Sequence, residues 1–474
     1  MQPAGRSIPD GFPRGKPVSM ARRLYWSAYW LRHSLGQARF DRQPLARILR
    51  DQTRRLRRIV AYAYRFVPYY RETLDALGLS PADFRTFADL AKLPIIDPDV
   101  LRRDPGRFIS IERHPENSVT LRSAGSTGVP RTICYDTGSL MQSAAHGERT
   151  RRVLASHLGK RFGYRNAVIA PPSSSTTEIQ AFWDDHLIAP RGLPTVRRTF
   201  SLFDPPEVLV AGLNAFRPDA IYTYGSCLEI LFSHLKSSGA FFHKPKVIAY
   251  SSCGLSESTR RLIKEEFGIP VFSGYQAVEA LKIGFECERH IGLHLNIDLC
   301  PVRIVDGDGR PVPDGSSGRV VISNLVNRGT VLLNYDLGDI SALLPRPCPC
   351  GRALPLLSFP VGREDDILRL PSGRILHPQA VARIFRDESQ VWQYQIVQES
   401  PERLRIALVP APEADLGSMR DRILERFRRI LGEAVSLEVR FQKTIPPTAG
   451  GKSRAVLSLC APGPKADSPA GTLG

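Results

Sequence analysis

The sequence predicts an α/β protein with a large N-terminal domain and a small C-terminal α+β domain. The chain has 474 residues, which is long for a single hydrophobic core and favours two or three domains. Between residues 167 and 272, short β-rich runs alternate with helical stretches, a pattern typical of βαβ units and a mostly parallel sheet. Short strands and turns follow residue 302, so a β-rich subdomain is expected before the C-terminal domain.

Composition is that of a globular protein. Hydrophobic residues make up 42% and charged residues 24%. No run of 18 apolar residues occurs, so no transmembrane segment is expected. Residues 1–17 have no apolar core of the kind found in signal peptides and are expected to be a disordered basic N-terminus. The spacing of the eight cysteines does not suggest the disulfide framework of a secreted protein, which favours reduced thiols and a cytoplasmic location.

The net charge of +18 is concentrated near the N-terminus. Residues 1–70 hold 15 Lys and Arg against 3 Asp and Glu, which gives +12. Such a patch suits nucleic acid, an anionic membrane face or an acidic partner. Residues 21–77 have a helical pattern, and apolar residues from 45 to 63 lie opposite a row of arginines, which favours a solvated helix face. No nucleic-acid motif accompanies the charge, so no nucleic-acid partner is expected; the oligomeric state is left open.

The first domain is expected to be built on parallel strands joined by helices. Because ligands gather at the carboxyl ends of such strands, loops that begin at Ser251 and Ser273 are expected to form pocket walls. The expected strands are 167–170, 220–224, 247–250 and 271–272, and the helices between the later ones are 228–235 and 258–267.

The remaining elements are shorter and more mixed. In the β-rich subdomain we expect strands at 302–305, 319–322 and 331–335. The C-terminal pattern is a helix at 378–385, strands at 391–397 and 404–409, a helix at 416–431 and a strand at 435–441. We therefore expect the divisions 1–17, 18–362, 363–366, 367–458 and a disordered tail at 459–474.

One stretch has the chemistry of a phosphate-binding loop, Ser-Ala-Gly-Ser-Thr-Gly-Val-Pro-Arg at 123–131. Glycines three residues apart adopt positive φ at little cost, so consecutive backbone N–H groups can curl round a phosphate. The nucleotide P-loop is excluded because no Gly-Lys-Ser/Thr closes the stretch. On this motif alone, an ordinary Ser/Gly surface turn is an equal alternative.

A second set of residues suits a metal. Cys287-x6-His294 and Cys348-Pro349-Cys350 supply three thiolates and an imidazole, a combination typical of a closed, tetrahedral structural zinc site. Buried free thiols are the alternative, and His290 could replace His294.

Four motifs follow the glycine loop: Tyr275-Gln-Ala-Val-Glu279, Tyr335-Asp-Leu-Gly-Asp339, Gly362-Arg-Glu-Asp-Asp366 and Gly450-Gly-Lys452. Together, in this order, the five motifs resemble the adenylate-forming superfamily of acyl-CoA synthetases. Within it the chain most resembles the phenylacetate-CoA ligase-like branch, which includes polysaccharide-cluster ligase-like proteins. The resemblance runs from about Tyr69 to Val456, and some members of this branch also have a zinc between a Cys…His pair and a Cys-x-Cys.

The resemblance implies ATP-dependent activation of a small carboxylic acid, possibly aromatic, as an acyl-adenylate, followed by thioester formation with coenzyme A. One alternative is transfer of the acyl group or of AMP to an amine, a hydroxyl or a cofactor. Another is a non-catalytic ligand-binding homologue. Retention of the charged residues Glu279, Asp339, Arg363 and Lys452 disfavours the non-catalytic alternative.

The resemblance also implies a role for each motif residue. Glu279 would hold Mg²⁺, Asp339 and Arg363 the ribose, and Lys452 would be catalytic on a mobile C-terminal domain that swings about Asp365. The ATP-binding residues would further include Ser123, Gly125, Ser126, Thr127, Gly128, Arg131 and Tyr275. The acid pocket would be lined by Tyr224, Gly225, Ser252, Gly254 and Gly274. Gln276 and Val278 depart from the Gly and Thr usual in the second motif, which weakens the expected contacts to the nucleotide.

Overall fold

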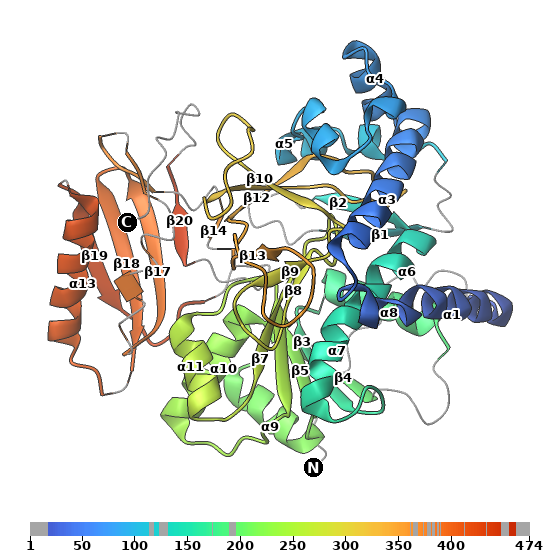
Figure 1. Ribbon diagram of the computed structural model, residues 1–474. Coiled ribbons are helices and arrows are strands. Elements are labelled where there is room, and N and C mark those ends of the chain that lie inside the picture. Colours follow the sequence, from blue (N-terminus) through green and yellow to red (C-terminus); the bar gives the residue numbers. More distant parts are fainter. Residues whose placement is uncertain are drawn as a thin grey trace.

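A computed structural model gives the structure of residues 18–112, 118–122, 131–172, 174–188, 196–360 and 362–363, and of most of 368–460 (Figure 1). From 368 to 460 it describes all residues except 373, 377–380, 382–383, 386–387, 389, 412, 433 and 447–454. Among the described helices, none has the combination of length and apolar character that a membrane span requires.

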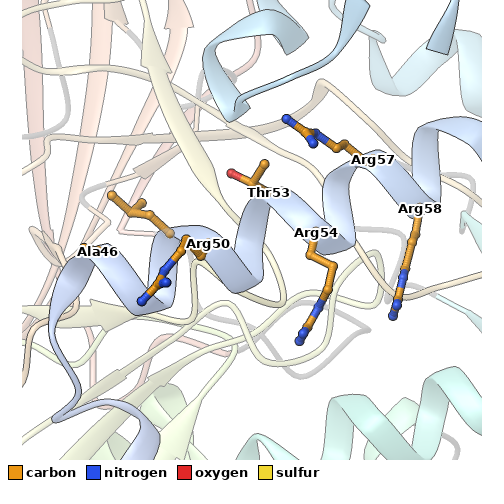
Figure 2. A pocket seen from close by; sticks show the side chains of 7 residues that line it. Ala46, Arg50, Thr53, Arg54, Arg57 and Arg58 are labelled. Carbon is orange, nitrogen blue, oxygen red and sulfur yellow. The ribbon is translucent and has the colours of Figure 1, made fainter. Parts of the chain in front are cut away.

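The N-terminal segment is helical and lies along one side of the first domain (Figure 1). The helix α3 is strongly amphipathic: Ile48, Leu56, Ile59 and Val60 are buried, while all its arginines except Arg55 are exposed or face outward. Figure 2 shows Arg50, Arg54, Arg57 and Arg58 around a shallow hollow on that outer face. The helices are α1 (Met20–Leu35), α2 (Gln37–Phe40), α3 (Leu45–Phe66), α4 (Pro68–Ala76) and α5 (Pro98–Arg103), with short 3-10 turns η1 (Pro81–Asp83), η2 (Phe87–Lys92) and η3 (Pro105–Phe108).

The centre of the first domain is an eight-stranded sheet in the order β13-β9-β8-β7-β6-β5-β3-β4. Strands β7, β6, β5, β3 and β4 run parallel, and β8, β9 and β13 extend the sheet antiparallel. The strands are β3 (Arg165–Ala170), β4 (Val196–Ser201), β5 (Ala220–Tyr224), β6 (Val247–Ser251), β7 (Val271–Tyr275), β8 (Gly284–Glu286), β9 (Leu293–Leu295) and β13 (Leu356–Leu357).

Helices cover both faces of this sheet, and side chains alternate between two cores. Ile221, Ile248 and Val271 pack with the helices α9 to α11, whereas Ala220, Val247 and Phe272 belong to the larger core that includes α3. The helices are α6 (Thr137–Ala145), α7 (Gly147–Leu158), α8 (Ser175–His186), α9 (Pro206–Phe216), α10 (Gly225–Ser238) and α11 (Glu257–Glu265).

Two smaller sheets complete the first domain. A hairpin of β1 (Ser118–Arg122) and β2 (Thr132–Asp136) flanks the predicted phosphate loop. A four-stranded antiparallel sheet has the order β10-β11-β12-β14. Its strands are β10 (Val302–Val305), β11 (Gly318–Ile322), β12 (Tyr335–Ser341) and β14 (Gly362–Arg363). The strand expected at 331–335 is therefore wrong, because strand pairing begins only at Tyr335.

The C-terminal region forms a separate sheet in the order β19-β18-β17-β20, with α13 packed on the face away from the first domain (Figure 1). Met419, Ile423 and Phe427 of α13 are buried against it. The elements are β15 (Leu368–Arg369), β16 (Ile375–Leu376), β17 (Val391–Ser400), β18 (Arg403–Pro410), α13 (Leu416–Leu431), β19 (Ser436–Phe441) and β20 (Val456–Ser458). Helix and strand positions expected from 391 to 441 are confirmed to within three residues at each end; the helix expected at 378–385 lies largely outside the described residues.

Candidate active site

Several residues predicted to bind ATP and Mg²⁺ come together between the first sheet and β12. Arg131 Nη1 lies 2.9 Å from Glu279 Oε1, and both side chains are buried. Arg131 Nη1 also donates to the hydroxyl of Tyr335 at 2.6 Å, and that hydroxyl lies 3.4 Å from Glu279 Oε1. Burial alone would lower the pKa of Arg131, but Glu279 and Tyr335 hold it above its ordinary value. The guanidinium is therefore fixed as a cation beside a carboxylate.

Backbone contacts hold Glu279 in this position. Asn324 donates through Nδ2 to the Glu279 carbonyl at 3.0 Å, and the hydroxyl of Tyr135 donates to the Val278 carbonyl at 2.8 Å. Asn324 and Tyr135 belong to other parts of the first domain. Their hydrogen bonds therefore hold the backbone at Glu279 in place, although this residue lies in the loop after β7. Val278, which replaces the usual Thr, contributes its carbonyl to this support.

The predicted ribose-binding residues are adjacent. The hydroxyl of Tyr275 donates to Asp339 Oδ2 at 2.7 Å. Asp339 of β12 is opposite Arg363 of β14 in the antiparallel register, and its charge also acts on Arg131. The structure thus brings together Arg131, Tyr275, Glu279 and Asp339, with the backbone of Arg363 beside them. The predicted loop residues 123–128, the hinge residue Asp365 and Lys452 lie outside the described residues.

The predicted acid-pocket residues lie at the carboxyl ends of β5, β6 and β7. Tyr224 ends β5 and is followed directly by α10. A Cβ atom on Gly225 would lie 2.2 Å from the Gly254 carbonyl, so the helix start and the loop after β6 touch through two glycines. Ser252 has φ +74, a value unusual for a residue with a side chain and often found at functional sites. Gly274 lies on the neighbouring strand, so all five residues share one edge of the sheet.

A hydrogen-bonded trio at this edge was not predicted from the sequence. Gln276 donates through Nε2 to the hydroxyl of Tyr222 at 2.8 Å, and that hydroxyl lies 2.9 Å from Ser251 Oγ. A Cβ on Gly274 would lie 3.1 Å from the same Gln276 nitrogen, so this side chain covers the glycine. The sequence analysis did single out Gln276, because it departs from the Gly usual in the second motif. The sequence alone could not show which residues this side chain contacts.

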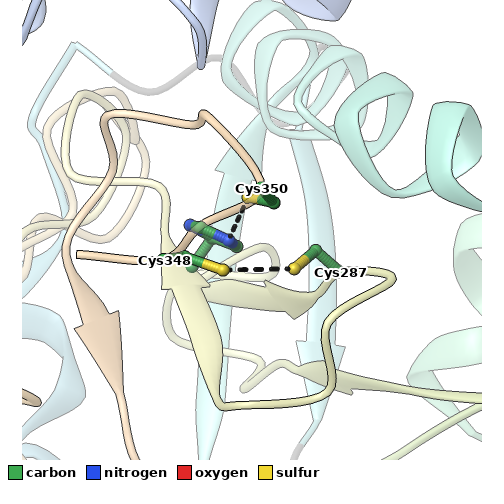
Figure 3. A group of neighbouring side chains, drawn as sticks. Cys287, Cys348 and Cys350 are labelled. Carbon is green, nitrogen blue, oxygen red and sulfur yellow. Dashed lines mark hydrogen bonds between the residues drawn. The ribbon is translucent and has the colours of Figure 1, made fainter. Parts of the chain in front are cut away.

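The four residues of the predicted metal set form one buried cluster (Figure 3). The potential ligand atoms of Cys287, His294, Cys348 and Cys350 all lie within 4.8 Å of one another. Cys287 Sγ and Cys348 Sγ are 3.7 Å apart, and Cys350 Sγ is 3.3 Å from His294 Nε2. Two thiolates bound at about 2.3 Å to one tetrahedral ion are separated by about 3.8 Å, so the cluster fits such an ion.

The surroundings of the cluster favour the ligand forms of His294 and Cys350, whereas burial raises the pKa of the Cys287 and Cys348 thiols. Burial, followed by the charge of Arg352, lowers the pKa of His294 to about 4, which keeps the imidazole neutral. Burial alone would raise the pKa of Cys350, but hydrogen bonds from Arg352 hold it below its ordinary value. His294 Nδ1 lies 3.3 Å from the Leu354 carbonyl, which leaves Nε2 for the cluster.

His290 is not part of the cluster. Its Nδ1 lies 2.7 Å from Glu286 Oε1, and its ring stacks on Phe272. Of the two histidines considered from the sequence, His294 is therefore the member of the set.

Known proteins resemble this chain over nearly its full length. Residues 368–458 match the family model described as the CapK C-terminal domain. The chain is 26% identical over 462 residues to a phenylacetate-coenzyme A ligase of Thermus thermophilus, covering 89% of this chain and 99% of that ligase. It is 24% identical over 396 residues to a phenylacetate-coenzyme A ligase of Aromatoleum evansii, covering 80% and 86%.

The chain is thus similar in sequence to phenylacetate-coenzyme A ligases over most of its length. Its fold is that of 2-hydroxyisobutyryl-CoA ligase in the postadenylation state in complex with R3-HIB-AMP, with a TM-score of 0.72, 19% sequence identity, and coverage of 90% of this chain and 91% of that one. The predicted α/β class is thereby confirmed.

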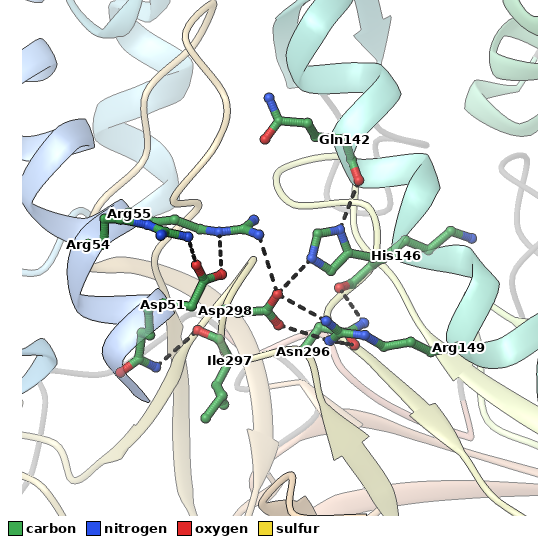
Figure 4. Close-up of polar contacts among 11 residues, drawn as sticks. Asp51, Arg54, Arg55, Gln142, His146, Arg149, Asn296, Ile297 and Asp298 are labelled. Atoms are coloured by element: carbon green, nitrogen blue, oxygen red, sulfur yellow. Dashed lines mark hydrogen bonds and ion pairs between the residues drawn. The ribbon is translucent and has the colours of Figure 1, made fainter. Parts of the chain in front are cut away.

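The chain also contains a buried ionic cluster that links the N-terminal helix α3 to α7 (Figure 4). Arg149 of α7 binds both carboxylate oxygens of Asp298, at 2.8 and 3.0 Å, and both side chains are fully buried. His146 Nε2 lies 2.9 Å from Asp298, and Arg55 of α3 lies 3.7 Å from it. Arg149 and His146 hold the pKa of Asp298 well below its ordinary value although burial alone would raise it.

Proposed function

We propose that this chain activates a small carboxylic acid with ATP as an acyl-adenylate and then forms a thioester with coenzyme A, releasing AMP. The observation that supports this most directly is the convergence of Arg131, Glu279, Tyr275 and Asp339 beside the carboxyl ends of β5 to β7. A cation and carboxylates for a nucleotide thus lie beside the edge of the sheet where an acid would bind. The homologous phenylacetate-CoA ligases support the same reaction.

The ion pair between Arg131 and Glu279 suggests how ATP would be received. In the protein alone, each charge neutralises the other in a buried position. When ATP binds, Arg131 would turn to the phosphates, assisted by the backbone and hydroxyl groups of residues 123–128. Glu279 would then hold Mg²⁺, a cation that prefers carboxylate oxygen and that screens the phosphate charge. Arg131 would thus exchange the carboxylate of Glu279 for the phosphates, and Glu279 would exchange Arg131 for Mg²⁺.

The other motif residues would orient the nucleotide and drive the two half-reactions. Asp339 would accept hydrogen bonds from the ribose hydroxyls, with Tyr275 and Arg363 beside it. Lys452 would meet the charge that builds when the carboxylate attacks the α-phosphate. We propose that residues 367–458 form a domain that swings about Asp365, within residues 363–366, between adenylation and thioester formation.

The acid itself would bind among Tyr224, Gly225, Ser252, Gly254 and Gly274. Gln276 occupies part of the space that Gly274 leaves open, so we propose a compact acid for this pocket.

We further propose that the Cys/His cluster holds one structural zinc, since four protein ligands close the site to chemistry. All eight cysteines are free in the structure, which agrees with the reducing conditions of the cytoplasm, where we propose the protein acts.

Pyrophosphate exchange with radiolabelled pyrophosphate tests the proposal. Purified protein is incubated with ATP, Mg²⁺ and a panel of aryl, short aliphatic and hydroxy acids, with and without coenzyme A. We expect exchange with at least one acid in the absence of coenzyme A, and acyl-CoA only in its presence. Exchange without any thioester would indicate another acceptor, and no exchange with any acid would contradict acid activation.

A further inference from the structure

The helix α1 exposes an apolar stripe along its whole length. Met20, Leu24, Leu31 and Leu35 are 62%, 58%, 51% and 72% exposed. Their spacing of four, seven and four residues places them on one line of the helix, and the exposed Ala28 lies between them. Five of the seventeen exposed large apolar side chains among the described residues lie on this one helix, with Tyr25 as the fifth.

The opposite face of α1 is anchored to the first domain. Trp26, Tyr29 and Trp30 pack against the large core. The hydroxyl of Tyr29 accepts from Gln142 Nε2 of α6 at 2.7 Å, and Ser27 Oγ accepts from the Ile188 backbone at 2.9 Å. Tertiary contacts therefore fix α1 with its apolar line outward, at the periphery of the molecule (Figure 1).

The charge around the stripe is of one sign. Arg32 flanks it, Arg22 and Arg23 lie in the first turn of α1, and α1 contains no acidic residue. Residues 1–70 have a net charge of +12, from 15 basic and 3 acidic residues. On α3, which follows after the short α2, Arg50, Arg54, Arg57 and Arg58 line one hollow (Figure 2) together with the exposed Leu49, and Arg54 is paired with Asp51. The N-terminal helices thus combine exposed apolar side chains with a large excess of positive charge.

We propose that α1 docks the protein onto an anionic lipid membrane, lying in the interface with Met20, Leu24, Leu31 and Leu35 among the acyl chains. An interfacial helix of this kind needs an apolar face and a polar face rich in Lys and Arg. The charge selects this occupant. A second copy would bring equal positive charges face to face, and the chain's own residues 1–17 are also basic. Anionic headgroups instead match the arginines, each of which adds to the attraction.

Vesicle co-sedimentation of the full chain tests the docking. Vesicles of phosphatidylcholine alone are compared with vesicles that also contain phosphatidylglycerol. We expect binding to the anionic vesicles that weakens as sodium chloride is raised, and little binding to the neutral ones. The double substitution Leu24→Glu and Leu31→Glu should weaken binding at least about tenfold, because two apolar side chains are replaced by charges. Arg22→Gln with Arg32→Gln should weaken binding and flatten its salt dependence.

Phe241→Glu is the matched control. Phe241 is 78% exposed in the loop between α10 and β6, away from α1, so this variant should bind like the unaltered protein. Thermal unfolding of all variants should be unchanged, since every altered side chain is exposed. Three results would overturn the proposal: no binding to anionic vesicles, equal loss in the Phe241→Glu control, or binding only after residues 1–17 are deleted. Sedimentation velocity that shows a dimer dissolved by the Leu24/Leu31 change, without vesicle binding, would assign the stripe to self-association instead.

Discussion

Among the described residues, Asp339 is the one whose substitution should weaken ATP binding most directly. Its carboxylate accepts from Tyr275, and we expect it to accept from ribose hydroxyls as well. Asp339→Ala should raise the KM for ATP and reduce kcat/KM by about 1.5–3 kcal/mol for each lost charge-assisted hydrogen bond. Steady-state kinetics with ATP as the varied substrate measures this. Asp308→Ala, on an exposed turn, is the control, and unchanged ATP kinetics in Asp339→Ala would refute the ribose assignment.

Cys348 tests the metal cluster. Zinc bound by four side chains contributes to folding, so Cys348→Ser should lower the melting temperature and the zinc content together. Elemental analysis should find about one zinc per chain in the unaltered protein. A chelator should lower the melting temperature of the unaltered protein toward that of Cys348→Ser. Cys460→Ser, outside the cluster, should behave like the unaltered protein. Zinc-free protein that melts like the variant would show that the thiols are only packed.

At this scale the sequence identified charged and metal-ligating residues better than neutral ones. Arg131, Glu279 and Asp339 were predicted because motifs contain them, and the structure brings them together. Tyr335 was not given a role, although its hydroxyl touches both Arg131 and Glu279. A tyrosine at the start of a strand is common in any core, so residue type alone gave no reason to select it.

Among the elements, α3 and α7 are joined by the buried carboxylate of Asp298. Asp298→Ala would leave Arg149 buried and unpaired, which should cost about 3–5 kcal/mol of unfolding free energy. Chemical denaturation measures this loss. The double variant Asp298→Ala with Arg149→Leu should recover part of it, since no buried charge is then uncompensated. Equal stability of the single and double variants would mean that packing, rather than charge, dominates the site.

The sequence predicted most elements that have a clear period and few that owe their pairing to distant contacts. The helix α13 begins and ends where its apolar spacing predicts, at Leu416 and Leu431. The strand β4 was missed because its Val-Arg-Arg-Thr sequence is polar and is defined by parallel pairing with β3. The short β8, β9 and β13 were missed for the same reason: two or three residues show no period, and these strands are defined by pairing with segments distant in the sequence.

On the scale of the whole molecule, Glu229 makes the contact between α10 and the C-terminal sheet sensitive to pH. Burial raises its pKa from 4.5 to about 7, against opposing hydrogen bonds from Ser256 and Gln393 of β17. The folded protein therefore binds the proton more tightly than the unfolded chain. The associated stabilisation is fully present below pH 4.5 and is lost as pH rises through about 7. Thermal unfolding from pH 5 to 8 should show this loss, Glu229→Gln should abolish it, and Glu257→Gln, exposed on α11, should leave it unchanged.

Lys452 tests whether the two half-reactions use different arrangements of the molecule. The segment that contains it leads into β20, the edge strand paired with β17. Lys452→Ala should slow adenylation by about two orders of magnitude, or roughly 3 kcal/mol, yet convert supplied acyl-adenylate to acyl-CoA at a nearly unaltered rate. Pyrophosphate exchange and a thioester assay measure the two steps separately. Equal slowing of both would contradict the proposed domain movement.

The contact between Gly225 and Gly254 has a mechanical consequence. Gly225 begins α10 with no room for a methyl group, and Glu229 lies one turn further along the same helix, in contact with Gln393 of β17. A helix transmits displacement as a stiff rod over such a distance. An acid too large for the space near Gly225 would press on the first turn of α10 and strain the contact at its second turn. The size of the acid that the pocket accepts and the position of the C-terminal sheet would then both depend on the first two turns of α10.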